Sequence, residues 1–199
     1  MKGITTLLFS LFLLFGFTSY LPSATAFDVL DTDGKLLRNG GSYYVVPVKR
    51  GSGGGIELAA TGNETCPLTV VQSPNKASKG KPLSLAFPIL FPYITPNFPF
   101  QIMFASVPTC TPTRLWIVVD GLPEGPAVKI GGYRDARSGA FQVQKASQRG
   151  CNHYKLLFCL DDTCEDIGVY VDSEGNRRLV LTKNDPFLVQ FQRVTSSTA

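Results

Sequence analysis

The apolar positions of this chain form short runs separated by turn-forming residues, and helical periodicity is scarce. The runs are rich in Val, Ile, Leu, Phe and Tyr, and Gly, Pro, Asn and Asp punctuate them. This pattern is typical of an all-β barrel or sandwich. In residues 187–192 apolar and polar positions alternate, which predicts a strand with one face in the core. The predicted strands are 43–48, 68–72, 100–104, 115–119, 127–130, 141–145, 154–160, 168–171, 179–182 and 187–192.

A turn motif occurs near both ends of the chain. Residues 27–46 read FDVLDTDGKLLRNGGSYYVV, and residues 170–181 read YVDSEGNRRLVL. In both, an acidic turn ending in Gly precedes a β-rich run. Such a sequence is typical of a β-hairpin, because Gly adopts the positive φ that the turn needs and Asp caps the turn. The repetition suggests a fold built from repeated hairpin units. The matching residues are Asp31, Asp33 and Gly34 in the first copy and Asp172, Glu174 and Gly175 in the second.

The first 26 residues have the form of a secretory signal peptide. Lys2 is followed by the apolar run 4–17 and by Ala-Thr-Ala at 24–26, a small-any-small cleavage sequence. An uncleaved anchor is the alternative, but a membrane-spanning helix needs about 20 apolar residues. We expect a mature single domain of residues 27–199. One third of it, about 58 residues, suits a four-stranded unit, so a β-trefoil of twelve strands with three-fold pseudo-symmetry fits, with a sandwich as the alternative.

Charge excludes one class of partner. The formal net charge is +4, or +3 after loss of Lys2, and acidic groups are mixed among the basic ones. This composition indicates no nucleic-acid partner. No later segment approaches membrane length, so no membrane partner is expected either. The pair Arg177 and Arg178 is predicted to lie on a solvated hairpin face.

The five cysteines all lie in the mature part, where an oxidising compartment favours disulfides. Cys159 and Cys164 enclose only four residues, so their pairing is the easiest local closure. Of the other three, Cys66 and Cys110 would close a long segment, which the loop-entropy model values at about 4 kcal/mol, against about 2 for the short loop. Cys151 would then remain as a buried thiol, as the bridge of a disulfide-linked homodimer, or as part of a shuffled pairing. Since His153 is the one histidine, a zinc site is a weak alternative, and we expect no metal and no cofactor.

Two stretches are not predicted as strands. The Gly-rich residues 51–55 are a loop without the strand-to-helix setting that nucleotide phosphates require. Residues 82–99 contain five prolines interleaved with large apolar side chains. Proline at this density argues against a central strand and for an extended loop. Exposed apolar loops mark binding surfaces, and the alternative is a loop packed onto the barrel as extra core.

Six blocks follow one another along the chain: VLDTDGKLLRNGGSYYVV, GNETCPLTVVQS, LPEGPAVKIG, YKLLFC, CEDIG and GNRRLVLTKNDPFLVQFQ. In this order they resemble the plant Kunitz-type protease inhibitor family. The resemblance covers residues 27–194 and implies a twelve-stranded β-trefoil that is secreted or vacuolar and serves in plant defence. It also implies the disulfides Cys66–Cys110 and Cys159–Cys164, with Cys151 unpaired.

The resemblance further implies one exposed, substrate-like loop at residues 87–93, with the scissile position between Leu90 and Phe91. The side-chain amide of Asn39 corresponds to the family's internal support of that loop. A serine protease is therefore the expected partner. The reactive-loop residues implied in this way are Pro88, Ile89, Leu90, Phe91 and Pro92.

The residues at the scissile position bear on the target. Trypsin's primary pocket ends in a carboxylate, which Leu90 would leave buried and unpaired, so we expect chymotrypsin-, elastase- or subtilisin-like targets. Pro92 has no N–H to donate to a protease, where other loops of this kind donate one. That loss costs roughly 1–3 kcal/mol.

Other functions are weaker interpretations. With one histidine and no GxSxG sequence, no nucleophile–base pair can be assembled, so we expect no enzyme. A lectin would need an aromatic platform in each repeat, yet Trp116 is the one tryptophan. The serious alternative is a storage, defence or signalling protein that kept the fold, lost inhibition and binds a different protein. Asn63 opens a glycosylation sequon, Asn-Glu-Thr.

Overall fold

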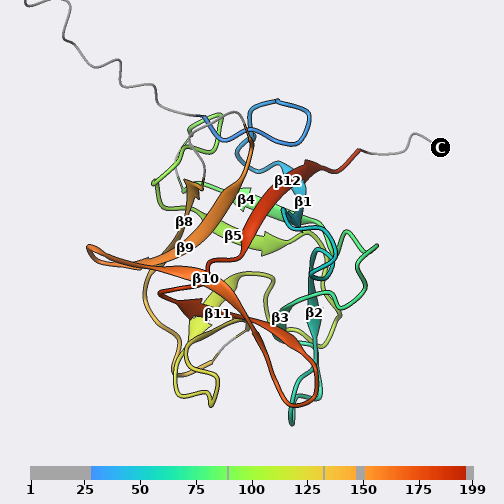
Figure 1. Ribbon diagram of the computed structural model, residues 1–199. Helices are drawn as coiled ribbons and strands as arrows, with labels where there is room; N and C mark the ends of the chain where they lie inside the picture. Colours follow the sequence, from blue (N-terminus) through green and yellow to red (C-terminus); the bar gives the residue numbers. More distant parts are fainter. Residues whose placement is uncertain (1–27, 89, 132, 147–150, 196–199) are drawn as a thin grey trace, which may run out of the picture.

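The computed structural model describes residues 28–88, 90–131, 133–146 and 151–195 (Figure 1). The expected signal peptide, residues 1–26, lies outside them. Within these ranges the chain forms twelve strands, and no helix that could cross a membrane is found there. The strands are β1 (Ser42–Pro47), β2 (Ile56–Ala59), β3 (Thr69–Gln72), β4 (Leu83–Ala86), β5 (Gln101–Phe104), β6 (Trp116–Val119), β7 (Ala127–Ile130), β8 (Ala140–Lys145), β9 (Tyr154–Leu160), β10 (Thr163–Val171), β11 (Arg177–Thr182) and β12 (Leu188–Arg193).

Six of the strands close into a barrel. β1 pairs with β4 and β12, β4 with β5, β8 with β9, and β9 with β12, all antiparallel. The ring is completed between β5 and β8 by an isolated bridge from Phe100 to Phe141. A closed barrel leaves no long unpaired edge among these strands.

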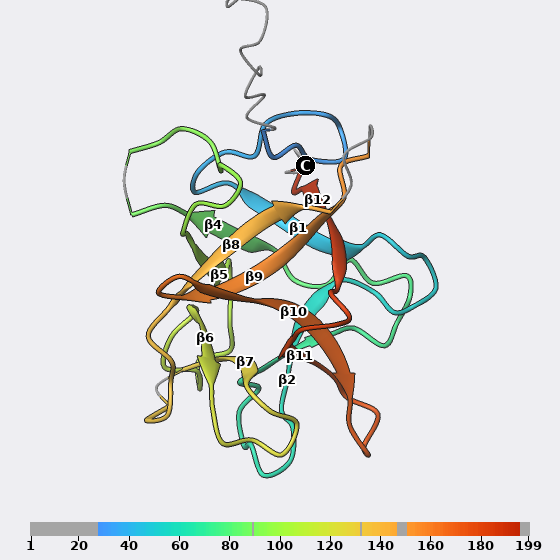
Figure 2. The same ribbon diagram turned by 60° about the vertical axis from the view of Figure 1, so that its left-hand side comes forward.

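The other six strands form three hairpins that cover one end of the barrel, the lower end in Figure 2. The hairpins are β2–β3, β6–β7 and β10–β11. They meet one another through β3 with β7, β7 with β11 and β3 with β11. The chain thus repeats a four-strand unit three times, β1–β4, β5–β8 and β9–β12, which confirms the predicted β-trefoil with three-fold pseudo-symmetry.

The core follows from the alternation of side chains along the barrel strands. In β12, Val189 and Phe191 are fully buried, whereas Leu188 is exposed, as the alternating pattern predicts. Residues i and i+2 of a strand share a face, so each barrel strand contributes its inward residues to one continuous core. Leu83 and Leu85 of β4 are likewise fully buried.

The prediction that residues 82–99 contain no central strand is wrong for the beginning of that stretch. β4, Leu83–Ala86, lies inside that stretch and pairs on both sides, with β1 and with β5. Pro82 and Pro88 flank the strand and do not interrupt it, so neither removes a ladder hydrogen bond. The predicted strands also missed β2, a four-residue strand, and the first five residues of β10.

The prediction of a solvated Arg177–Arg178 face is also wrong. The Arg178 side chain is 13% exposed and forms ion pairs with Glu124 and Asp172, the latter at 2.7 Å. Arg177 donates to Oε1 of the buried Gln72. Glu124 lies in the β6–β7 turn and Gln72 in strand β3, and both elements belong to other repeats. The sequence around the two arginines therefore did not indicate these two partners.

Two disulfides cross-link the chain. Cys66–Cys110 joins the β2–β3 connection to the β5–β6 connection across 44 positions. Cys159–Cys164 joins paired residues of β9 and β10. Cys151 is exposed and lies outside both bonds.

Candidate functional site

The connection between β4 and β5, residues 87–100, projects from the end of the barrel opposite the three hairpins (Figures 1 and 2). At its tip Leu90 is 103% exposed, and Phe91 and Tyr93 are 48% and 40% exposed. At its base Phe87 and Ile94 are buried in the core, at 7% and 2%. The loop is therefore fixed at both ends and presents apolar side chains at its tip. Ile89 lies outside the described residues.

Asn39 connects the two arms of this loop from beneath. Its side-chain Oδ1 accepts a 2.8 Å hydrogen bond from the Phe87 N–H, and its Nδ2 donates one of 2.8 Å to the Phe91 carbonyl. Its own backbone N–H donates to the Pro92 carbonyl at 3.0 Å. One residue thus holds the loop backbone on both sides of the position between Leu90 and Phe91.

The segment before β1 places Asn39 by a tight turn. Gly40 has a φ of +73°, which favours Gly, and its N–H donates to the Leu85 carbonyl of β4 at 2.7 Å. A side chain at Gly41 would approach the Tyr43 ring to 2.8 Å. The two glycines of the RNGGSYY sequence therefore allow this turn to lie close against β1 and β4.

An aromatic cluster supports the loop from its other side. The Phe87 ring lies edge-to-face on Phe98, Phe91 and Phe100, with centroids 5.2, 6.2 and 6.2 Å apart. Phe91 and Phe98 also meet edge-to-face, at 5.8 Å. These rings are the second means by which the loop is held, and the sequence analysis had not assigned a role to Phe98. The recurrence of Phe in the loop was the available signal.

The other predicted site residues are spread over the molecule. Pro88 and Pro92 are exposed beside Leu90. Asn63 is exposed in the β2–β3 connection, on the hairpin side of the barrel, far along the chain from the loop. Among the described residues, no group of three or more His, Cys, Asp and Glu side chains could hold a metal ion.

A polar cluster next to Asn63 was not found by sequence reasoning. Glu64 forms a 2.6 Å ion pair with Lys129, and the hydroxyls of Thr69 and Tyr133 donate to the same carboxylate. Burial alone would raise the pKa of Glu64, but hydrogen bonds from Lys129 and Thr61 outweigh it and hold that pKa below its usual value. Burial beside Glu64 raises the pKa of Tyr133. This cluster stabilises the junction of two hairpins.

The chain is similar in sequence and in structure to known protease inhibitors. A legume Kunitz family model, described as trypsin and protease inhibitor, matches residues 29–193. A Kunitz-type trypsin inhibitor of Glycine max is 50% identical, over 98% of this chain and 99% of the relative. Trypsin inhibitor A of Glycine max is 47% identical, over 94% of this chain and 91% of the relative. Soybean trypsin inhibitor in a complex with porcine pancreatic trypsin superposes with a TM-score of 0.79 at 45% identity, covering 84% of this chain and 99% of that one.

Proposed function

Because the chain belongs to the legume Kunitz family of trypsin and protease inhibitors, we propose that it inhibits serine endopeptidases through the loop of residues 87–93. Leu90 fills the primary pocket of the protease, and the bond between Leu90 and Phe91 occupies the scissile position. After removal of residues 1–26 the single domain 27–199 acts outside the cell or in a vacuole.

The observation that carries the proposal is the exposure of Leu90 on a loop whose backbone is held on both sides. Leu90 is fully exposed, while the flanking Phe87 N–H and Phe91 carbonyl are bonded to Asn39. A fixed loop enters a protease cleft without the ordering entropy that a flexible peptide loses. Burying the Leu90 side chain then contributes about 1.5–3 kcal/mol.

The same contacts explain inhibition in place of digestion. The Phe91 carbonyl accepts from Asn39 and the Phe91 ring contacts Phe98, and neither contact uses the atoms of the bond between Leu90 and Phe91. The new amino terminus would therefore stay beside the acyl group, and reformation of the bond would compete with hydrolysis.

The apolar side chain of Leu90 favours proteases whose primary pocket is apolar. The relatives are named trypsin inhibitors, and trypsin's pocket carries a carboxylate. A leucine there leaves that charge desolvated and unpaired, which is strongly unfavourable. We therefore infer chymotrypsin-, elastase- or subtilisin-like targets for this chain.

The test is a set of inhibition constants for residues 27–199 against trypsin, chymotrypsin, elastase and subtilisin. The wild type should inhibit at least one enzyme with an apolar pocket more strongly than trypsin. Leu90→Arg should reverse that order, and Arg114→Leu, a change at an exposed arginine outside the loop, should not alter it. A wild type that inhibits none of the four, with Leu90→Arg equally inactive, would refute the proposal.

A second function is favoured by one observation. Pro92 has no N–H, and its carbonyl already accepts from Asn39, so this position offers little to the backbone pairing that proteases use. If the inhibition assays fail, the exposed apolar tip would instead serve a protein partner that is not an endopeptidase.

A further inference from the structure

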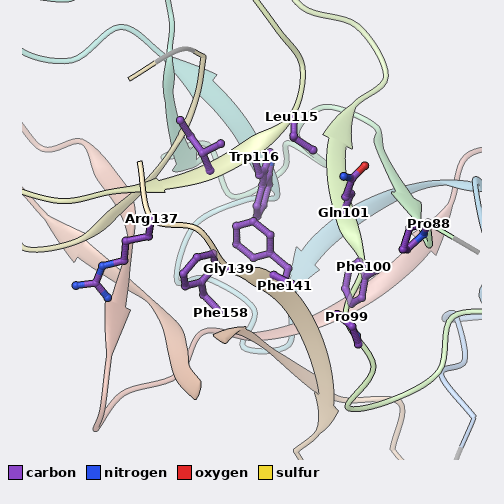
Figure 3. Close-up of a pocket in the computed structure, with 12 residues that line it drawn as sticks. Pro88, Pro99, Phe100, Gln101, Leu115, Trp116, Arg137, Gly139, Phe141 and Phe158 are labelled. Carbon is purple, nitrogen blue, oxygen red and sulfur yellow. The ribbon is translucent and has the colours of Figure 1, made fainter. Parts of the chain in front are cut away.

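A cavity of about 240 Å³ lies in the wall of the barrel, beside the base of the loop. Figure 3 shows its lining: Pro88 and Pro99 at one end, Arg137 at the other, and aromatic rings between them. The rings are those of Phe100, Trp116, Phe141 and Phe158. The lining therefore combines aromatic rings with polar groups such as those of Gln101 and Arg137.

The cavity lies where the barrel is least tightly paired. β4–β5 and β8–β9 are continuous ladders, whereas β5 and β8 meet through the bridge from Phe100 to Phe141. The Phe100 N–H donates to the Phe141 carbonyl at 2.9 Å, and the next bond between these segments is from the Asn97 N–H to the Val143 carbonyl. Side chains of the core, among them Phe100 and Phe141, line the cavity at this seam.

The rings behind the seam are arranged in series. Phe104 contacts Trp116 at 6.0 Å between centroids, Trp116 contacts Phe141 at 5.8 Å, and Phe141 contacts Phe158 at 5.3 Å. The last two contacts are edge-to-face, an arrangement that aromatic pairs prefer. An aromatic ligand would extend this series.

Trp116, one of the lining residues, carries a polar group without a partner. The indole Nε1 of Trp116 is buried, and no acceptor for it lies among the described residues. An unsatisfied buried donor is destabilising, and a ligand with an acceptor relieves that cost. A hydroxyl-bearing ring should thus bind better than a plain hydrocarbon.

The mouth of the cavity disfavours an anion. Arg137 is its cationic residue, but its guanidinium is paired with Asp120 at 2.8 Å and with Glu165 at 3.2 Å. Two carboxylates thus oppose one cation. An arylcarboxylate would add a third negative charge at this end, so a neutral ligand fits better.

We propose that this seam cavity binds a small neutral aromatic molecule that carries a hydrogen-bond acceptor, of the phenol class. A cavity of 150 Å³ lined by apolar side chains holds benzene, and drug-sized ligands occupy roughly 300–1,000 Å³. The 240 Å³ seam cavity therefore suits one substituted ring. The cavity shares Pro88 with the proposed inhibitory loop, but the inference does not depend on inhibition.

Trp116 provides the readout, because as the single tryptophan it produces one indole N–H signal in a ¹H–¹⁵N spectrum. Residues 27–199 are titrated with p-cresol, with toluene and with benzoate. p-Cresol should shift the indole signal saturably, with a Kd near 1 mM or below, and show NOEs from its ring protons to Trp116. Toluene should bind about fivefold more weakly, and benzoate should cause no saturable shift.

A matched pair of variants locates the binding. Ala140→Leu places a larger side chain on β8 at the cavity, and Ala105→Leu makes the same change at an exposed position outside it. The first should weaken p-cresol binding at least tenfold, and the second should leave it unchanged. If p-cresol leaves the wild-type indole signal unshifted, or shifts it no more than toluene does, the proposal is wrong, whatever the variants show.

Discussion

The ring of Phe98 lies edge-to-face against the ring of Phe91, with centroids 5.8 Å apart. Phe91 follows the proposed scissile bond, and Phe87, on the other side of that bond, contacts both rings. One aromatic cluster therefore holds both sides of the bond.

Replacing Phe98 by Ala should weaken inhibition about tenfold, because two edge-to-face contacts of about 0.5–1.5 kcal/mol each are lost at the loop. The bond between Leu90 and Phe91 should also be cleaved faster on incubation with the protease. Inhibition assays and mass spectrometry of the cleaved chain measure the two effects.

The control for this change is Phe187→Ala, since Phe187 is also partly buried against the core but lies directly before β12. It should lower the thermal midpoint without altering the inhibition constant. Equal inhibition by the two variants would show that Phe98 stabilises the fold and does not position the loop.

Asn39→Ala should weaken inhibition by about tenfold to a hundredfold, because it removes hydrogen bonds to Phe87 and Phe91 worth roughly 0.5–1.5 kcal/mol each. Arg38→Ala, at the neighbouring exposed position, is the control and should inhibit like the wild type. If the Asn39 variant retains full inhibition, the loop owes its rigidity to the aromatic cluster and the prolines.

Pro92→Ala should strengthen inhibition about tenfold. The new N–H can pair with the protease, a gain of roughly 1–3 kcal/mol, which exceeds the 0.4–1 kcal/mol cost of a looser backbone. Pro96→Ala, elsewhere in the same loop, loosens the backbone without adding a donor at the tip and should inhibit no better than the wild type. An unchanged constant for the Pro92 variant would show that no protease acceptor faces this position.

The Glu64–Lys129 pair should make stability depend on pH in the acid range. The pKa of Glu64 is lowered on folding, so its contribution is complete above its usual value of 4.5 and is lost as the pH falls through the folded-state value. Glu64→Gln should cost about 3 kcal/mol at pH 7, because Lys129 remains buried and unpaired, and less at pH 3.

Urea unfolding at pH 7 and pH 3 measures this difference. Asp162→Asn, an exposed carboxylate in the turn between β9 and β10, is the control and should change stability little at either pH. A loss of stability from Glu64→Gln that is the same at both pH values would contradict the assignment.

Much of the fold could be predicted from apolar runs and turn residues, because the alternation of buried side chains is a local property of a strand. The errors have local causes too. Proline was counted over residues 82–99 as a whole, whereas the strand β4 fits between Pro82 and Pro88. β2 is short and follows a Gly-rich loop, so the apolar pattern of its four residues was too brief to predict a strand.

The sequence by itself determined the positions of most strands, the family and the chemical character of the loop, since an apolar Leu90 among prolines is visible without any fold. The resemblance implied that Asn39 supports the loop, and only the tertiary structure decided which backbone groups it bonds and that Phe98 packs against Phe91. Asn39 reaches Phe91 across 52 positions, and Arg137 reaches Glu165 across 28. Such contacts arise when strands of different repeats pair, and no local pattern of hydrophobic residues records which distant segments will meet.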